Sequence, residues 1–184
     1  MENVNRDSVP PESALLLIDL QRDFLTDDGR MPVARNQVAQ LIDAANAAVA
    51  RFRASGQPIV AIGNEFRRSD LIMNLLRRNA CLAGSVGAMW DTRVPISNAQ
   101  YFPKWATDAF CNPALEPWLR ERHVKTLVVT GLMASACVTA TAKSALHRGC
   151  AVRLIEDAIA CSSDRSKLRA IARLQRRGAA SLQV

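Results

Sequence analysis

The chain has 184 residues, of which 49% are hydrophobic, and a formal net charge of +7. This length fits one domain with a sizeable core, and no apolar run reaches the roughly 18 to 20 residues that a membrane span requires. The basic surplus could attract phosphate backbones, but only 5% of the residues are aromatic and available to stack on bases, so a solvated surface or attraction of anionic substrates is favoured over nucleic-acid binding.

The first predicted elements are a strand and a helix. Residues 1–12 are expected to form a disordered arm, and residues 13–184 the domain. The continuous apolar run over residues 14–18 indicates a strand buried on both faces, which ends at Asp19. Apolar residues then recur at helical spacing over residues 38–52.

This alternation continues to the end of the chain. Strands are predicted at residues 59–62, 100–103, 126–130, 151–155 and 179–183, and helices at residues 71–78, 113–122, 136–148 and 164–177. Strands alternating with helices of this length predict an α/β fold, a doubly wound, mostly parallel Rossmann-like sheet with helices on both faces.

The cysteines and the start of the chain bear on its surroundings. The five cysteines are an odd number without a C-x-x-C pair, which favours reduced thiols over disulfides or a zinc knuckle. The start, MENVNRDSVPPES, lacks the apolar stretch of a signal peptide. A cytoplasmic protein is therefore expected.

Polar residues that follow strands are the first candidates for chemistry, because sites in an open parallel sheet form beyond the carboxyl ends of the strands. Asp19 follows the first strand, Lys104 follows the segment 100–103, and Cys137 lies a turn beyond the strand 126–130. These three residues are the candidates, and the placement of Lys104 at a strand end rests on the weakest pattern of the three.

Cys137 begins a predicted helix, so the positive end of the helix dipole would favour its thiolate. The N–H groups of that first turn are also able to bind an oxyanion. A buried structural cysteine is the alternative interpretation, and position alone does not decide between the two.

A thiol nucleophile needs a base, and neither histidine is well placed. His123 precedes a strand and His147 lies in the last turn of a helix, where a surface role or a C-terminal cation is the simpler interpretation. Asp19 is the best candidate to accept the proton, and Lys104 would hold both charges in the site. Taken singly, Asp19 is also explained as a cap and Lys104 as a solvated side chain.

Several segments together resemble the isochorismatase-like cysteine hydrolases, a superfamily that includes nicotinamidase, N-carbamoylsarcosine amidohydrolase and ureidoacrylate amidohydrolase. The segments are ALLLIDLQRDF at residues 14–24, FPKWATDAF at 102–110, VVTG at 128–131 followed by ACVTATA at 136–142, and EDA at 156–158. The resemblance implies a catalytic triad of Asp19, Lys104 and Cys137. It also implies a non-proline cis peptide between Met133 and Ala134 and an oxyanion hole made by the N–H groups of Ala134 and Cys137.

The chain departs from the nicotinamidase pattern after the second strand. Nicotinamidases of this superfamily typically carry a metal site with an aspartate and several histidines there, whereas residues 63–70 read GNEFRRSD. No metal and no other cofactor is therefore expected. Isochorismatases proper act on a vinyl ether and lack the cysteine, so Cys137 favours an amide or related C–N bond.

The resulting prediction is a metal-independent thiol hydrolase of a small amide, ureido or carbamoyl compound. Hydrolysis of a vinyl ether or ester, and a lapsed hydrolase that serves as a binding or scaffold protein, are the alternatives. The expected partners are a small-molecule substrate and, by analogy, a second copy or more in a homodimer or homotetramer, with no nucleic acid and no membrane. Possible substrate-binding residues, for each of which core packing is an alternative, are Phe24, Asn64, Trp90 and Trp105.

Overall fold

Six parallel strands form one sheet, in the order β3-β2-β1-β4-β5-β6, in the computed structural model of the chain, which describes residues 9–183. The predicted α/β fold with a parallel sheet is confirmed. The strands are β1 (Ser13–Ile18), β2 (Ile59–Asn64), β3 (Gln100–Lys104), β4 (Thr126–Gly131), β5 (Ala151–Ile159) and β6 (Ala180–Ser181). The α-helices are α1 (Arg22–Leu25), α2 (Val38–Ala54), α3 (Leu71–Leu76), α4 (Leu115–Glu121), α5 (Thr139–His147) and α6 (Asp164–Gln175).

Short tight turns complete the list. Three are 3₁₀ turns, η1 (Arg35–Gln37), η2 (Val86–Ala88) and η3 (Ala109–Cys111), and η4 (Ala134–Val138) is a π-helical turn that runs directly into α5. None of the helices in residues 9–183 is long and apolar enough to cross a bilayer.

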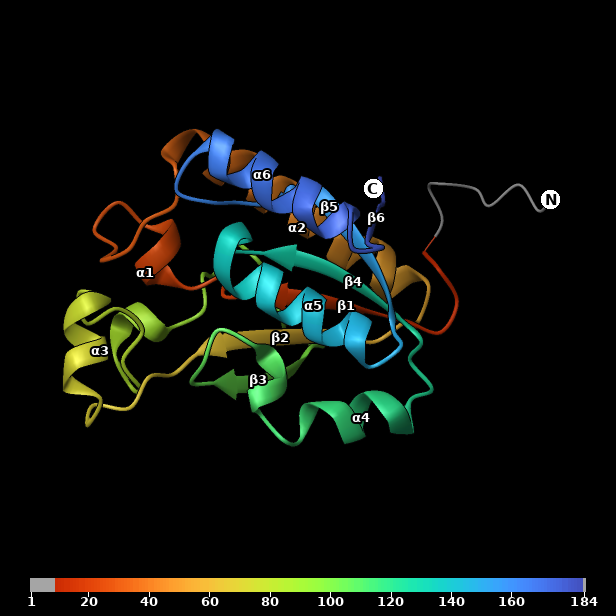
Figure 1. Cartoon of the computed structure of the whole chain (residues 1–184), viewed down its shortest axis with the longest axis horizontal. Coiled ribbons are helices and arrows are strands. Elements are labelled where there is room, and N and C mark those ends of the chain that lie inside the picture. Colours follow the sequence, from red (N-terminus) through yellow and green to blue (C-terminus); the bar gives the residue numbers. More distant parts are fainter. Residues whose placement is uncertain (1–8, 184) are drawn as a thin grey trace.

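The central strand β1 is apolar from Ala14 to Ile18 because both faces of the sheet are covered. Its residues alternate between two apolar clusters: Leu16 and Ile18 join one cluster, and Leu15 and Leu17 join the other. The first cluster packs under α4, α5 and α6, and the second packs under α2, so that the sheet lies between two helical layers (Figure 1). Burial on both faces explains why the strand reads as a continuous apolar run.

The sheet has a switch point at β1, which pairs with β2 on one side and with β4 on the other. Its last residue, Ile18, lies opposite Ile62 of β2 and Gly131 of β4. Gly131 has φ +107°, and a Cβ at this position would lie 2.0 Å from the Ile18 carbonyl oxygen, so only glycine fits. This close approach brings the carboxyl ends of β1 and β4 together, where sites form in such folds.

Strand β5 and the start of the described chain add to the predicted pattern. Strand β5 continues past residue 155 to Ile159, with a bulge in its pairing with β4. Residues 1–8 of the predicted arm lie outside the described residues. At residue 12, the carbonyl of Glu12 accepts hydrogen bonds from the N–H groups of Lys125 and Thr126, which ties the start of the described chain to β4.

Helix α3 presents unusually exposed apolar side chains. Leu71, Ile72, Leu75 and Leu76 are each between 72% and 78% exposed. The helix lies at the end of the sheet toward which β2 points (Figure 1). The homo-oligomer expected from the sequence stays a prediction.

Candidate active site

Asp19, Lys104 and Cys137 meet at the switch point of the sheet. Asp19 directly follows β1, Lys104 is the last residue of β3, and Cys137 lies in the π-helical turn η4 after β4. The Lys104 Nζ atom is 3.0 Å from Asp19 Oδ2 and 3.3 Å from Cys137 Sγ. Asp19 and Lys104 are fully buried, and Cys137 is 8% exposed. The structure therefore brings together the three side chains that the sequence singled out.

Lys104 reaches this point across the end of β2. Strand β2 lies between β3 and β1, and Asn64 at its end is in register with Lys104. The Lys104 ammonium donates hydrogen bonds to Asn64 Oδ1 at 2.5 Å and to the Ala106 carbonyl at 3.2 Å, besides its contacts with Asp19 and Cys137. Four surrounding acceptors hold the ammonium in one place, as a buried lysine requires.

The side chain of Gln21 fixes the end of β2 beneath the site. Its Oε1 accepts from the Asn64 N–H at 2.8 Å, and its Nε2 donates to the carbonyls of Asn64 at 2.9 Å and Ala88 at 2.7 Å. Gln21 is completely buried. Sequence reasoning missed this residue, although it lies two positions after Asp19, because nothing in its type or spacing shows what its amide binds.

Replacing Gln21 by leucine is expected to destabilise the protein by roughly 2 to 4 kcal/mol, because three buried backbone groups would lose their partners. The exposed Gln100, which donates only to the carbonyl of its neighbour Tyr101, supplies the control. The variant Gln100→Leu should stay within about 0.5 kcal/mol of the parent protein in urea unfolding. Equal midpoints and slopes for both variants would contradict the role of Gln21.

Burial governs the protonation of the three groups. Burial first, and the Asp19 carboxylate second, raise the pKa of Cys137 to about 12, and the ammonium of Lys104 only partly opposes them. Burial also raises the pKa of Asp19, against the lowering effect of Lys104. Burial alone would lower the pKa of Lys104, but the neighbouring Asp19 and Cys137 raise it. These shifts favour a neutral thiol beside a charged lysine, against the thiolate that the helix dipole led us to expect.

The carboxylate oxygens of Asp19 are free to accept a proton. Among residues 9–183, neither of its oxygens has a hydrogen-bond partner of good geometry, although Oδ2 forms the ion pair with Lys104. Buried carboxylate oxygens are normally hydrogen-bonded. This carboxylate therefore has unused capacity to accept a proton from a thiol or to bind a group of a ligand.

Two backbone expectations at the turn after β4 are corrected. The non-proline cis peptide joins Leu132 and Met133, one bond before the predicted position between Met133 and Ala134. The Ala134 N–H donates to the Ala160 carbonyl at 2.8 Å, so this predicted oxyanion donor is already committed to the chain that follows β5. The Met133 N–H, by contrast, has no hydrogen-bond partner within the described part of the chain.

The four predicted substrate-binding residues lie in different surroundings. Asn64 contacts Lys104 and belongs to the site. Phe24 is 5% exposed and packs in the apolar cluster under α2, and Trp90 is half-buried with its Nε1 donating to the Val94 carbonyl. Trp105 is 40% exposed directly after Lys104. A substrate-binding role for these residues stays a prediction.

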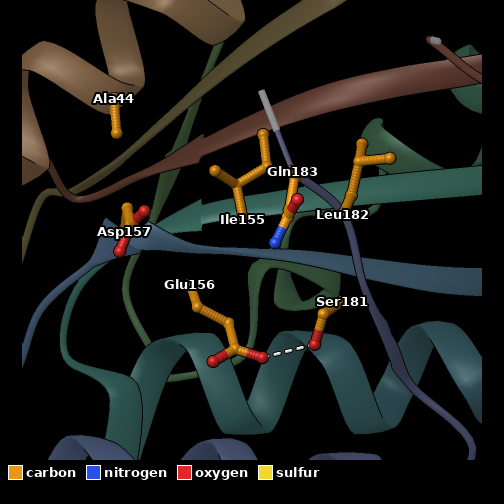
Figure 2. A pocket seen from close by; sticks show the side chains of 7 residues that line it. All are labelled: Ala44, Ile155, Glu156, Asp157, Ser181, Leu182 and Gln183. Atoms are coloured by element: carbon orange, nitrogen blue, oxygen red, sulfur yellow. Dashed lines mark hydrogen bonds between the residues drawn. The ribbon is translucent and has the colours of Figure 1, made fainter. Parts of the chain in front are cut away.

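A pocket of about 530 Å³ lies elsewhere, between α2, the end of β5 and the last residues of the chain (Figure 2). Glu156 and Asp157 contribute to it, and the Ser181 hydroxyl donates to Glu156 in Figure 2. None of the three residues at the switch point lines this pocket. Glu156 and Asp157 therefore belong to a different part of the surface from Cys137.

The family model of the isochorismatase domain matches residues 13–184. An uncharacterized isochorismatase family protein of Bacillus subtilis is 29% identical over 153 residues, which are 82% of this chain and 79% of that protein. The ureidoacrylate amidohydrolase of Cronobacter turicensis is 28% identical over 157 residues, 72% of this chain and 67% of that protein. These matches confirm the resemblance that the motifs carry.

Solved structures agree with the sequence comparisons. The pyrazinamidase of Pyrococcus horikoshii, in complex with zinc, superposes with a TM-score of 0.83 at 27% identity and covers 95% of this chain and 100% of that one. The N-carbamoylsarcosine amidase of Thermoplasma acidophilum superposes with a TM-score of 0.80 at 26% identity, covering 93% and 95% of the two chains.

The side chains of this protein do not fit a zinc ion near the thiol. Zinc in proteins is held by three or four cysteine, histidine or carboxylate ligands. Within residues 9–183, no three or more histidine, cysteine, aspartate or glutamate side chains lie close enough together to hold a metal ion. Asn64, the last residue of β2, and Glu65, which follows it, have no histidine beside them.

Proposed function

The chain belongs to the isochorismatase family, and on this premise we propose that it hydrolyses a C–N bond of a small amide, ureido or carbamoyl substrate through an acyl-enzyme on Cys137. One observation carries the proposal: the fully buried Lys104 ammonium lies 3.0 Å from the Asp19 carboxylate and 3.3 Å from the Cys137 sulfur. A buried carboxylate, ammonium and thiol in contact are costly for stability, which favours a chemical role.

The first half of the reaction forms the acyl-enzyme. Because burial keeps the Cys137 thiol neutral, the sulfur attacks the substrate carbonyl while Asp19 accepts the thiol proton. The carbonyl oxygen becomes an oxyanion, and the Met133 and Cys137 N–H groups are the proposed donors to it. Protonated Asp19 then passes its proton to the leaving nitrogen, the C–N bond breaks, and the amine departs.

The second half restores the thiol. Water attacks the thioester carbonyl as Asp19, again a carboxylate, takes one of its protons. The C–S bond breaks, the acid product leaves, and Asp19 returns the proton to the Cys137 sulfur. Lys104 stays charged throughout and holds the carboxylate and the sulfur in position, together with Asn64. No step requires a metal or another cofactor.

A substrate screen tests the bond that is cleaved. The protein would be incubated with panels of small primary amides, ureido acids and N-carbamoyl amino acids, and in parallel with esters and vinyl ethers, while released ammonia, acid and, for the vinyl ethers, ketone or aldehyde are measured. We expect at least one compound of the C–N panels to be turned over with release of ammonia. Turnover confined to the C–O panel, or turnover of nothing in either, contradicts the proposal.

On the acid side of the pH profile, the fall of kcat/KM should follow the pKa of Asp19. Its carboxylate must be ionised to accept the thiol proton, so kcat/KM should fall as the pH drops through its pKa. Because burial raises that pKa, the midpoint of this fall should lie above 3.8, the usual value for aspartate. Measurement of kcat/KM from acidic to alkaline pH checks this.

On the alkaline side of the profile, kcat/KM should stay constant, because burial also raises the pKa of the Cys137 thiol. With the Cys137 pKa at about 12, no gain from thiol ionisation is expected near pH 8.5, where an ordinary cysteine ionises. A clear rise in kcat/KM around that pH would show that a preformed thiolate is the nucleophile, and the concerted proton transfer to Asp19 would be wrong.

A further inference from the structure

A second polar site lies on the other side of the turn that carries Cys137. A pocket of about 200 Å³ opens between η4, the start of α5 and the side of α6. Helix α6 packs beside both η4 and α5 (Figure 1). It is lined by Ser135, Thr139, Ser166, Arg169, Ala170 and Arg173. Two of the six residues are arginines, and none is acidic.

The two arginines of the pocket lie on the same face of one helix. Arg169 and Arg173 are one helical turn apart on α6, so that their positive charges are neighbours and repel one another. Both are exposed, and within residues 9–183 neither forms an ion pair or hydrogen bond. Two other exposed arginines, Arg120 and Arg148, are paired with Glu116. In the described part of the chain, Arg165 and Arg176 are exposed without an ion pair, like the two arginines of the pocket. An anion between Arg169 and Arg173 would relieve their repulsion.

Ser166 adds an uncharged donor at the same place. Its Oγ accepts a hydrogen bond from the Ser163 Oγ at 3.0 Å, so the proton of the Ser166 hydroxyl remains available. The Ser163 hydroxyl in turn accepts from the Ser166 N–H as the cap of α6, which fixes the pair. Ser166 lies in the first turn of this 12-residue helix, where the helix dipole favours negative charge.

Nearby acidic side chains are occupied with other partners. Asp164, on the same helix, accepts from the Gln37 Nε2 at 2.6 Å, and Glu156 accepts from the Gln175 Nε2 at 2.9 Å. These bonds come from neutral amides and leave both negative charges in place, but neither carboxylate lines the pocket, where the charged side chains are Arg169 and Arg173. Guanidinium forks and a hydroxyl are the groups that proteins use to hold the oxygens of phosphate.

We propose that the pocket between η4 and α6 binds the phosphate group of a small anionic ligand through Arg169, Arg173 and Ser166. The site is distinct from the proposed catalytic one. Cys137 faces Lys104, and Thr141, one turn further along, accepts from the Ala109 N–H on that same side. Ser135 and Thr139 face α6 instead. A ligand here would contact the turn that carries the thiol without entering the reaction, as an effector does.

Calorimetric titration with inorganic phosphate at constant ionic strength tests this site. The parent protein should bind one phosphate saturably. The double variant Arg169→Ala/Arg173→Ala should lose about tenfold or more in affinity, because two charge-assisted hydrogen-bond donors are removed. Ser166→Ala, which keeps every charge, should lose a few-fold on the same grounds.

The matched control is Arg165→Ala/Arg176→Ala, which removes the same charge from exposed positions of α6 and the residue after it but leaves the pocket intact. This control should bind phosphate within about twofold of the parent protein. Equal losses in the two double variants would show diffuse attraction to a basic helix and overturn the proposal, as would the absence of saturable binding by the parent protein. The readout is binding alone, so it stands whether or not the chain proves to be a C–N hydrolase.

Discussion

Replacing Lys104 by methionine is expected to lower the free energy of unfolding by roughly 3 to 5 kcal/mol and to abolish turnover. The side chain is completely buried, and its removal leaves the Asp19 carboxylate buried without a counter-charge. Without the ammonium, the pKa of Asp19 would rise further, so that the residue would be protonated and unable to accept the thiol proton. Urea unfolding and kcat/KM on an established substrate measure the two effects.

A double variant separates charge pairing from packing. Asp19→Asn/Lys104→Met removes both buried charges, so it should recover much of the stability lost in Lys104→Met while remaining inactive. Lys125, which pairs with Glu12 at the surface and is 72% exposed on its side chain, supplies the control. Lys125→Met should change the stability by no more than about 1 kcal/mol. A Lys104→Met protein as stable and active as the Lys125→Met protein would contradict the site described.

Replacing Cys137 by alanine should reduce kcat/KM by on the order of 10⁴-fold or more, because no group remains to form the acyl intermediate. The effect on folding should be small by comparison, since alanine fills most of the space of a thiol and, within residues 9–183, the Cys137 sulfur donates to no backbone group. The charged pair of Asp19 and Lys104 would stay intact 3.0 Å apart. Activity and thermal unfolding of the same preparation would show this separation.

Cys150→Ala provides the comparison for Cys137→Ala. Cys150 is half-buried, packs against the apolar cluster under α5 and has no contact with Asp19 or Lys104. Its replacement should leave kcat/KM within about twofold of the parent value. If the two cysteine variants lose activity equally, the thiol of Cys137 is not the nucleophile.

The fold was largely predictable because it depends on burial pattern. The apolar runs of β1, β2 and β4 and the helical spacing of α2 are local signals, and a parallel sheet buried on both faces is what they imply. The placement of sites at the carboxyl ends of parallel strands made Asp19, Lys104 and Cys137 candidates, and the family resemblance implied that they form one triad.

The properties of those three groups were less predictable, because they depend on what surrounds each atom. The sequence around Cys137 does not show that the residue is 8% exposed beside a carboxylate, and these two facts raise its pKa against the predicted thiolate. The commitment of the Ala134 N–H to Ala160 is likewise a long-range contact. The hydrogen bonds between Gln21 and Asn64 link the segment after β1 to the end of β2, and neither segment alone predicts them.

The aromatic residues illustrate the same limit. Phe24 and Trp90 lie near the motif residues in sequence or are of a type that suits a planar substrate, yet their described contacts are with the apolar cluster under α2 and with Val94. Aromatic side chains fill cores as readily as they line pockets, and only the packing distinguishes the two uses.

Mass spectrometry of the intact protein offers the most direct test of a nucleophilic Cys137. A substrate found in the screen would be mixed with the protein and quenched in acid within the first turnovers, and the site of any added mass would be located by peptide mapping. We predict an increment equal to the acyl group of the substrate on the peptide that holds Cys137, and none in Cys137→Ala. Turnover without such an adduct under any quench time, or the same adduct in Cys137→Ala, would contradict the account.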